Sequence, residues 1–254
     1  MLYFVRVIQI QKTAFALGVS VHIRDHSQCS GGPFFKWNLV MSASPSVVQP
    51  ASETKILMSD PTALGVFGLA IVTLVAASQK LGWTSGTTFV LPWALFLGAG
   101  AQIWASTVDF KKNNYFGAIV LGVYGLFWMG VALHWAIAQG WFGPVDRAAD
   151  PRQFAFACIG YGIFSFFIMI ASFETNKVFA AILVLINLLF PSLALSILGV
   201  NPAFFSGMAA VVELLISLLG FYAAGAIFLN GFFGRILVPL GAPLGLIRKG
   251  SAGK

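Results

Sequence analysis

Polar side chains lie at helical spacing within an apolar stretch near the middle of the chain. Gln102, Ser106 and Asp109 are separated by four and three residues, so one α-helix would present all three on one face. Tyr124 and Trp128 are four residues apart in the next apolar segment. Amide and hydroxyl groups donate hydrogen bonds to carboxylate oxygens. The pattern predicts a polar stripe and an aromatic stripe along a path for a solute.

Gln102 and a later proline each leave two interpretations open. The Gln102 amide either donates to a carboxylate in the path or bonds a neighbouring helix. Pro191 has no N–H group, so the carbonyl of Asn187, four residues earlier, loses its helical donor. Such a kink is tolerated where it faces protein or water. Asn187 therefore marks either a packing kink or a polar position of the path.

Glu213 is the only acidic residue deep within an apolar segment. An ionised, unpaired carboxylate is costly in hydrocarbon, so this side chain is protonated, paired or in contact with a wet cavity. One interpretation makes Glu213 a proton site. The other makes it a neutral carboxyl group that bonds a neighbouring helix or subunit.

Residue patterns typical of enzymes do not occur in the sequence. HExxH, GxSxG, GxGxxG and the Walker A loop are missing, and no cluster of Cys, His and carboxylate residues has metal-ligand spacing. Cys29 and Cys158 lie far apart and form no disulfide framework. We therefore expect no enzyme activity, no metal and no cofactor. Transfer of a solute fits the chain better.

The composition places the chain in a lipid bilayer. Only 9% of the 254 residues are charged and 58% are hydrophobic, whereas a soluble domain carries about 25% charged residues. The formal net charge of +7 would suit nucleic acid, but the basic residues lie in loops and tails between apolar runs, as in membrane proteins. The expected partner is the bilayer and not nucleic acid.

Six continuous apolar segments predict the fold. Each holds about 19–25 residues, enough for a helix to cross roughly 30 Å of hydrocarbon. Continuous rather than alternating hydrophobicity predicts helices and not barrel strands. We expect an all-α integral membrane protein whose six transmembrane helices form a bundle around a narrow path. The segments are Ala63–Leu81, Phe89–Val108, Phe116–Ala138, Phe154–Phe173, Val178–Leu198 and Phe205–Leu229.

The regions around these segments differ in character. Residues 1–57 are expected to form a flexible extension, in which residues 1–40 are either a disordered tail or a stretch that precedes a true start at Met41. Residues 58–241 form the predicted six-helix transporter domain, and residues 242–254 a cytoplasmic tail.

Loop charge predicts the orientation in the membrane. From Met41 onward, eight Lys and Arg residues lie on the side that holds both termini, and three lie on the other side. Positively charged loops stay in the cytoplasm, so we expect a multi-pass protein of the plasma (inner) membrane with both termini cytoplasmic. The three cations on the outer side are Lys80, Arg147 and Arg152.

Three local patterns, in this order, resemble the acetate uptake transporter family, which includes the bacterial succinate–acetate permeases. Asp60 to Val66, DPTALGV, is similar to the family's NPAPLGL signature. AQIWASTVDFKKNNYFG followed by VYGLFW resembles AQIFAG, EYKKGNTFG and SYGSFW. FGRILVPLG, from Phe233 to Gly241, resembles the family's FGR…LP segment. The resemblance runs from Met58 to the end of this last segment and covers all six predicted spans.

The resemblance implies a function and an assembly. Members of the family carry acetate and related small monocarboxylates, some also succinate, by proton symport or channel-like passage. They form hexamers in which each six-helix protomer has its own path, narrowed by a hydrophobic layer. By resemblance this layer lies at Leu69, Tyr124 and Ile186. The implied path residues are Asp60, Pro61, Leu64, Gly65, Leu69, Gln102, Tyr124, Ile186 and Asn187.

The chain departs from the family signature in ways that bear on the path. Ala63 replaces a proline and Asp60 replaces an asparagine. An ionised Asp at the positive end of the first helix partly cancels a field that favours anions. We therefore expect Asp60 to be a helix N-cap. Asp60 and Glu213 are the two candidate proton sites. Leu69 stands where an aromatic residue is usual, which predicts either a wider path or a gap filled by a neighbour.

These observations predict a transporter or channel for acetate and related small monocarboxylates, with succinate as a further candidate substrate. A small carboxylate and a proton are the expected solute partners. Within the same class, the alternative is a channel for a small neutral solute such as urea or ammonia. From another class, the alternative is a non-transporting membrane scaffold or sensor, although the short loops leave no domain for signalling.

Overall fold

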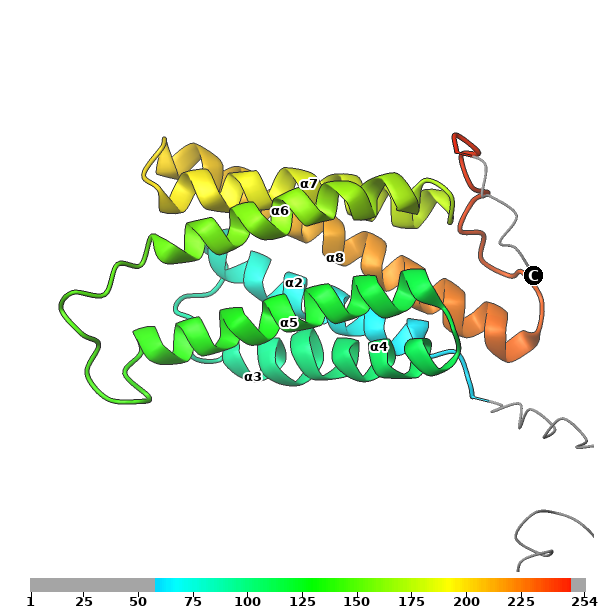
Figure 1. Cartoon of the computed structure of the whole chain (residues 1–254), viewed down its shortest axis with the longest axis horizontal. Helices are drawn as coiled ribbons and strands as arrows, with labels where there is room; N and C mark the ends of the chain where they lie inside the picture. Colours follow the sequence, from blue (N-terminus) through cyan, green and yellow to red (C-terminus); the bar gives the residue numbers. More distant parts are fainter. Residues whose placement is uncertain (1–57, 248–254) are drawn as a thin grey trace, which may run out of the picture. The chain divides into compact units, whose positions relative to one another are not determined.

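The computed structural model describes residues 58–247, and all regular structure within this range is helical. The predictions made for residues 1–57 and 248–254 lie outside the described residues. All six apolar segments are helical over most of their length (Figure 1). The elements are α2 (Thr62–Lys80), α3 (Leu91–Trp93), the π-helix η1 (Ala94–Ala101), α4 (Gln102–Lys111), α5 (Tyr115–Ala138), α6 (Gln153–Ser172), α7 (Lys177–Ile197) and α8 (Pro202–Phe233).

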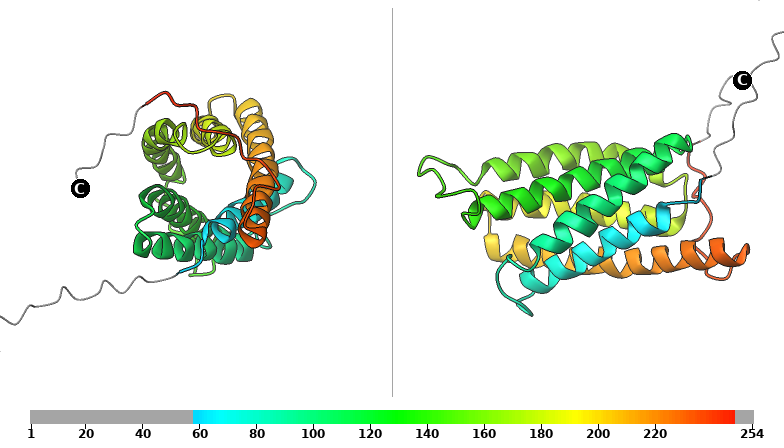
Figure 2. Two further views of the ribbon diagram at one scale, coloured as in Figure 1. Left: turned by 90° about the vertical axis from the view of Figure 1, so that its right-hand side faces the viewer. Right: turned by 90° about the horizontal axis from the view of Figure 1, so that it is seen from below.

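The helices form a ring when residues 58–247 are viewed along the helix axes (Figure 2, left). Helix α2 packs against α8 on one side and against η1 and α4 on the other. Helix α8 packs against α7, α7 against α6, and α4 with η1 against α5. The contact between α5 and α6 is much smaller and closes the ring. The first and last helices of the bundle therefore lie side by side.

The second predicted span is helical but not uniformly α-helical. It runs from Leu91 to Lys111, and its first half contains the eight-residue π-helix η1. A π-helix has a wider hydrogen-bond repeat than an α-helix and often marks a functional position. Where η1 ends, the Gln102 Nε2 group donates to the carbonyl oxygen of Gly98 at 2.7 Å. A side chain thus satisfies a carbonyl at the point where the helix type changes.

The outer surface of the ring is apolar. Phe96, Phe156 and Phe167 are 69%, 67% and 61% exposed, and many other large hydrophobic side chains share this face. Helices α2, α5, α6, α7 and α8 are long and apolar enough to cross a membrane, while η1 divides the second span into shorter helices. A surface of this kind is stable in lipid rather than in water. The protein is an all-α, multi-pass integral membrane protein, as the composition predicted.

Helix α2 is fixed by close backbone approach to both of its neighbours. A Cβ atom at Gly68 would clash with the carbonyl oxygen of Leu97 in η1, and one at Gly220 would lie 3.0 Å from the Cβ of Ala70. The Ser217 hydroxyl also donates to the Ala70 carbonyl oxygen at 2.8 Å. Helices in lipid associate through such close contacts and hydrogen bonds. Helix α2 therefore has little freedom between η1 and α8.

The segment after α8 folds back over the loop between α6 and α7. The Asn230 side chain bonds the backbone of two residues in this segment. The Leu244 N–H donates to the carbonyl oxygen of Phe173, and the Ile247 N–H donates to Glu174 Oε1, both at 2.8 Å. These bonds position the α6–α7 loop, which forms part of the cavity described next.

Candidate functional site

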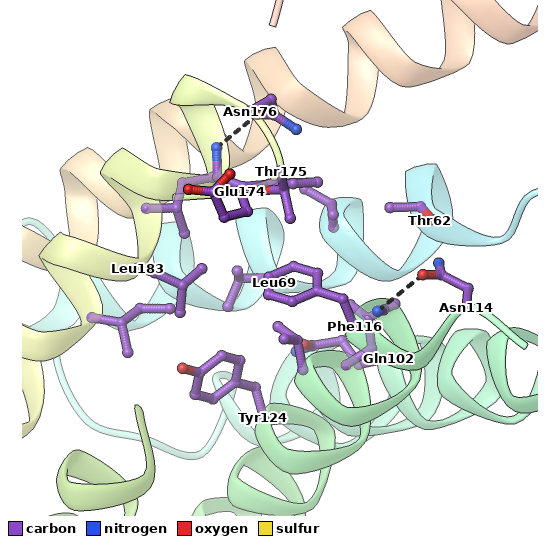
Figure 3. Close-up of a pocket in the computed structure, with 17 residues that line it drawn as sticks. Thr62, Leu69, Gln102, Asn114, Phe116, Tyr124, Glu174, Thr175, Asn176 and Leu183 are labelled. Atoms are coloured by element: carbon purple, nitrogen blue, oxygen red, sulfur yellow. Dashed lines mark hydrogen bonds between the residues drawn. The ribbon is translucent and has the colours of Figure 1, made fainter. Parts of the chain in front are cut away.

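A cavity of about 410 Å³ lies inside the ring at the end where α2, α5 and α7 begin, and we call it the main cavity. Figure 3 shows Leu69, Leu183 and Tyr124 facing one another across it, with Asn114 and Asn176 on its polar side. Four of the predicted path residues line it, from four different parts of the chain. They are Leu69, Gln102, Tyr124 and Ile186.

The mouth of the main cavity is formed by the starts of three helices. Thr62, Asn114 and Asn176 line it and stand at the starts of α2, α5 and α7. Asn114 Oδ1 accepts from the Gly117 N–H at 3.4 Å, and Asn176 Oδ1 accepts from the Phe179 N–H at 2.9 Å. Helix N-termini carry partial positive charge. Three of them around one opening favour an anion or the oxygen atoms of a carboxyl group.

The lining of the main cavity contains no cation to neutralise a bound anion. Its only formally charged lining residue within residues 58–247 is Glu174, and no Lys, Arg or His lines it. A carboxylate that moves past the helix starts therefore meets no opposite charge. The helix starts favour polar atoms at the mouth, whereas the interior favours a neutral molecule.

The inner end of the main cavity is apolar and closed by Tyr124. Leu69, Tyr124 and Ile186 are 9%, 3% and 4% exposed. The Tyr124 hydroxyl donates to Ser165 Oγ at 3.0 Å, so its proton is already engaged. The ring of Tyr124 also stacks against that of Phe190, with centroids 6.4 Å apart. Tyr124 thus presents its ring and the free lone pair of its oxygen, rather than an available donor.

Gln102 is buried at the wall of the main cavity. Its Nε2 group is bonded to Gly98 within its own helix, not to a neighbouring helix. Its Oε1 atom is buried and has no hydrogen-bond partner within residues 58–247. A buried acceptor without a donor is costly. This arrangement leaves Gln102 with an acceptor to offer to a protonated solute or to water.

Asn187 lies beside the cavity lining and ties helices together. Its Nδ2 group donates to the carbonyl oxygen of Ser165 at 3.0 Å and to that of Leu183 at 2.8 Å. Ser165 therefore receives bonds from both Tyr124 and Asn187, and it joins α5, α6 and α7. Pro191 lies inside α7 as predicted.

The residues of the first signature lie at the edge of the main cavity. Asp60 Oδ1 accepts from the Thr62 N–H at 3.0 Å and from Thr62 Oγ1 at 2.6 Å. Pro61, not Asp60, occupies the N-cap position, so Asp60 caps α2 from one residue further out. Leu64 is 42% exposed on the outer face, and Gly65 packs against its neighbours in the bundle. Of this segment, Thr62 and Val66 line the main cavity, and Thr62 does so at its mouth.

The predicted polar and aromatic stripes do not form one surface. The Ser106 hydroxyl donates to the carbonyl oxygen of Ala118 at 2.6 Å, so it binds α4 to α5. Asp109 is fully buried against Gly117 at the start of α5. Neither lines the main cavity, which Gln102 alone of the three reaches. Sequence spacing placed them on one face correctly, but that face is a helix contact.

A second cavity of about 250 Å³ lies at the opposite end of the ring, where α2 and α5 end and α8 begins. Glu213 lines it and is 2% exposed. Lys80 Nζ donates to Glu213 Oε1 at 3.0 Å and to Oε2 at 2.8 Å. From the sequence alone, Lys80 is expected only as a loop cation on the outer side of the membrane. Its long side chain instead reaches back along α2 to pair the buried acid.

Three aromatic side chains in contact link the linings of the two cavities, and we call them the aromatic barrier: Tyr124, Phe127 and Phe190. Tyr124 lines the main cavity and Phe127 the second. Phe190 is 2% exposed and contacts both rings. Sequence reasoning missed Phe127 and Phe190, because one buried phenylalanine among 25 in the chain carries no distinguishing signal.

Comparison with known proteins agrees with this architecture. The sequence pattern of the GPR1/FUN34/yaaH family matches residues 41–239. An uncharacterized protein of Methanothermobacter thermautotrophicus is 30% identical over 151 residues, which cover 56% of this chain and 74% of that protein. The succinate-acetate/proton symporter SatP of Escherichia coli is 26% identical over 185 residues, which cover 72% of this chain and 96% of SatP.

A solved structure, that of the bacterial acetate channel SatP, has the same fold. It superposes with a TM-score of 0.67 at 24% sequence identity, and the match covers 73% of this chain and 100% of the solved one. The family pattern spans every helix described above, from α2 to α8. The chain therefore belongs to the GPR1/FUN34/yaaH family.

Proposed function

We propose that the protein passes acetate and related small monocarboxylates across the membrane, through the main cavity, the aromatic barrier and the second cavity. The main cavity carries this proposal, because its mouth is polar, its inner end is apolar and no cation within residues 58–247 lines it. A carboxyl group fits the helix starts, and a short alkyl group fits the inner end. The names of two relatives, a succinate-acetate/proton symporter and an acetate channel, support the same substrate class.

The proton travels with the carboxylate through the main cavity and past the aromatic barrier in this mechanism. An ionised carboxylate pays a large penalty in an apolar interior, and the neutral acid avoids most of it. The neutral acid also has an O–H group, which the unpartnered Oε1 of Gln102 would accept. Succinate would need two protons and more room. We therefore expect acetate transport to rise as the pH falls toward the pKa of acetic acid, and succinate to compete weakly.

Flux measurements on purified protein in liposomes test the proposal. Radiolabelled acetate is followed at several pH values with the same pH on both sides, and protein-free liposomes report passive permeation of the neutral acid. Saturable, protein-dependent acetate flux that propionate inhibits is the expected result. Urea or ammonia flux without acetate flux would instead identify a neutral-solute channel. No flux of any solute would identify a scaffold or sensor.

The assembly and placement belong to the same proposal. We expect a hexamer of independent paths in the plasma membrane, with both termini in the cytoplasm. The apolar outer face and the excess of positive charge on the side of the termini support this arrangement. Native mass spectrometry tests the subunit number. Labelling of single cysteines, introduced in the α5–α6 loop and in the loop between α4 and α5, tests the orientation.

A further inference from the structure

The lining of the second cavity contains a lysine, whereas no lysine or arginine within residues 58–247 lines the main cavity. Lys80 lines the second cavity together with Glu213. The Lys80 side chain is 18% exposed and the Glu213 side chain is 2% exposed. The ammonium group therefore lies between a buried carboxylate and the open space of the cavity.

The ammonium group of Lys80 has bonding capacity left over. It has three N–H donors, and two are used by Glu213 Oε1 and Oε2 at 3.0 and 2.8 Å. Within residues 58–247 the Lys80 ammonium makes no other hydrogen bond. A third donor directed away from Glu213 is available to an anion in the cavity.

Other contacts also join the two helices that carry the ion pair. The Ser217 hydroxyl already bonds α8 to the Ala70 carbonyl of α2, and Gly220 allows their close approach. A buried ion pair adds little net stability, because desolvation of both charges offsets their attraction. Charged groups within membrane spans are costly and mark solute pathways. Binding of a ligand therefore explains the presence of the Lys80–Glu213 pair better than helix packing does.

The remaining walls of the second cavity suit the apolar part of a small organic acid. Trp128, Val131, Trp135 and Phe154 supply apolar surface, and Phe127 of the aromatic barrier forms the inner end. One cation within mostly apolar walls is the arrangement that binds and orients a small carboxylate. Because Phe127 is only three residues from Tyr124 of the main cavity, a solute bound here lies next to the barrier.

We propose that the second cavity is a binding site for the ionised form of a small monocarboxylate, with Lys80 as the group that binds the carboxylate. Glu213 holds the Lys80 ammonium when the site is empty and gives up part of that contact when the solute binds. The inference rests on the proposed function for its substrate class. It adds a binding site, and in it Glu213 competes with the solute carboxylate for the Lys80 ammonium group.

The test measures the proximity of acetate to the Lys80 nitrogen directly. The full-length protein, with ¹⁵N in its lysine ammonium groups, is placed in lipid bilayers with [1-¹³C]acetate. Solid-state rotational-echo double-resonance then detects acetate carboxyl carbons that lie close to a lysine nitrogen. In the wild type we expect part of the acetate carboxyl signal to be dephased, that is, reduced by a nearby lysine nitrogen, and this dephased fraction measures bound acetate. Absence of any dephased acetate in the wild type at saturating concentration would overturn the proposal.

Two variants make opposite predictions. Glu213→Gln keeps the shape and removes the competing charge, so acetate should bind on the order of tenfold more tightly. The double variant Lys80→Met with Glu213→Gln removes the cation without stranding a buried acid, and the dephased fraction should disappear. Unchanged or weaker binding in Glu213→Gln would contradict the competitor role, even if the double variant fails to fold.

A matched control and a parallel flux assay separate this site from the proposed function. Lys112→Met removes a lysine at the other end of the bundle and should leave the dephased fraction intact. Acetate flux without dephasing in the wild type would refute the second site and keep the transport function. Dephasing that the double variant abolishes, without flux in the wild type, would keep the site and refute the transport function.

Discussion

The Phe127 ring meets the Phe190 ring edge-on, with centroids 5.0 Å apart and ring planes at 87°. Phe127 lines the second cavity, and Phe190 stacks on Tyr124, which lines the main cavity. The two cavities are thus separated by about one helical turn of α5. On the proposed route from one cavity to the other, a solute passes these rings. We therefore expect them to set both the rate and the size limit of transport.

Replacement of Phe190 by leucine tests this role of the aromatic barrier. Phe190→Leu keeps an apolar side chain but removes the ring that contacts both Tyr124 and Phe127. If the activation free energy of passage falls by about 1 kcal/mol, flux rises roughly fivefold. Butyrate flux should rise more than acetate flux. Radiolabelled flux of the two acids in liposomes measures the ratio.

The control for this change is a phenylalanine on the outer face. Phe156 of α6 is 67% exposed and lines neither cavity. Phe156→Leu should leave both fluxes unchanged. An unaltered butyrate-to-acetate ratio in Phe190→Leu would show that the narrowest point lies elsewhere.

Substitution of Leu69 by phenylalanine should narrow the main cavity. Leu69 faces the cavity from α2, so an added ring occupies free volume rather than packed core. We expect acetate transport to persist and butyrate transport to fall severalfold, because the longer alkyl chain loses its space. Leu64→Phe, on the exposed face of the same helix, is the matched control. Equal effects of the two substitutions on butyrate flux would contradict the assignment of Leu69 to the path.

The sequence predicted the fold class because the signal for membrane helices is long and continuous. Runs of apolar residues identify the spans without knowledge of their packing. The π-helix η1 could not be predicted in this way, because a π-helix and an α-helix of the same composition have the same hydropathy. It lies where Gly68 lets the Leu97 carbonyl come close and where Gln102 bonds Gly98.

The candidate site was predicted unevenly, and the reason differs from residue to residue. Leu69, Gln102, Tyr124 and Ile186 come together in one cavity. Residue spacing points to Gln102 and Tyr124, whereas only resemblance to a family points to Leu69 and Ile186. The Lys80–Glu213 pair escaped notice because its partners are 133 residues apart and Lys80 stands at a helix end. A lysine at a membrane interface usually contacts water. Only the three-dimensional packing of α2 on α8 brings it to the buried acid.

The close approach of α2 to η1 predicts that Gly68 cannot tolerate a side chain. The Cβ of Gly68→Ala would clash with the Leu97 carbonyl oxygen, which is backbone and cannot rotate away. Overpacking of this kind costs about 1–3 kcal/mol of unfolding free energy. Gly225→Ala in α8 meets no atom within 4 Å and is the control. Thermal unfolding of both variants in detergent should show a lower midpoint for Gly68→Ala alone. Equal midpoints would mean that the contact relaxes at no cost.

Asp60→Asn tests whether charge at the cavity mouth controls entry of the carboxylate. Asp60 is exposed, and its Oδ1 atom caps α2 through Thr62, which lines the mouth. Asparagine keeps the same Oδ1 acceptor, so the helix start should be preserved while the negative charge is lost. A charge near a helix N-terminus is worth about 0.3–1 kcal/mol, which corresponds to about a two- to fivefold change in uptake.

The direction of the Asp60→Asn effect follows from the lost charge. A negative charge at the cavity mouth opposes the positive ends of the three helices, so its removal should raise acetate uptake. If Asp60 couples a proton to carboxylate passage, the ratio of uptake at pH 5 to uptake at pH 7 should also differ between the variant and the wild type. Asp150→Asn, which changes an exposed acid in the α5–α6 loop beside Arg152, serves as the control. If Asp60→Asn keeps the wild-type ratio, the pH dependence comes from the acid itself and Asp60 takes no part in proton coupling.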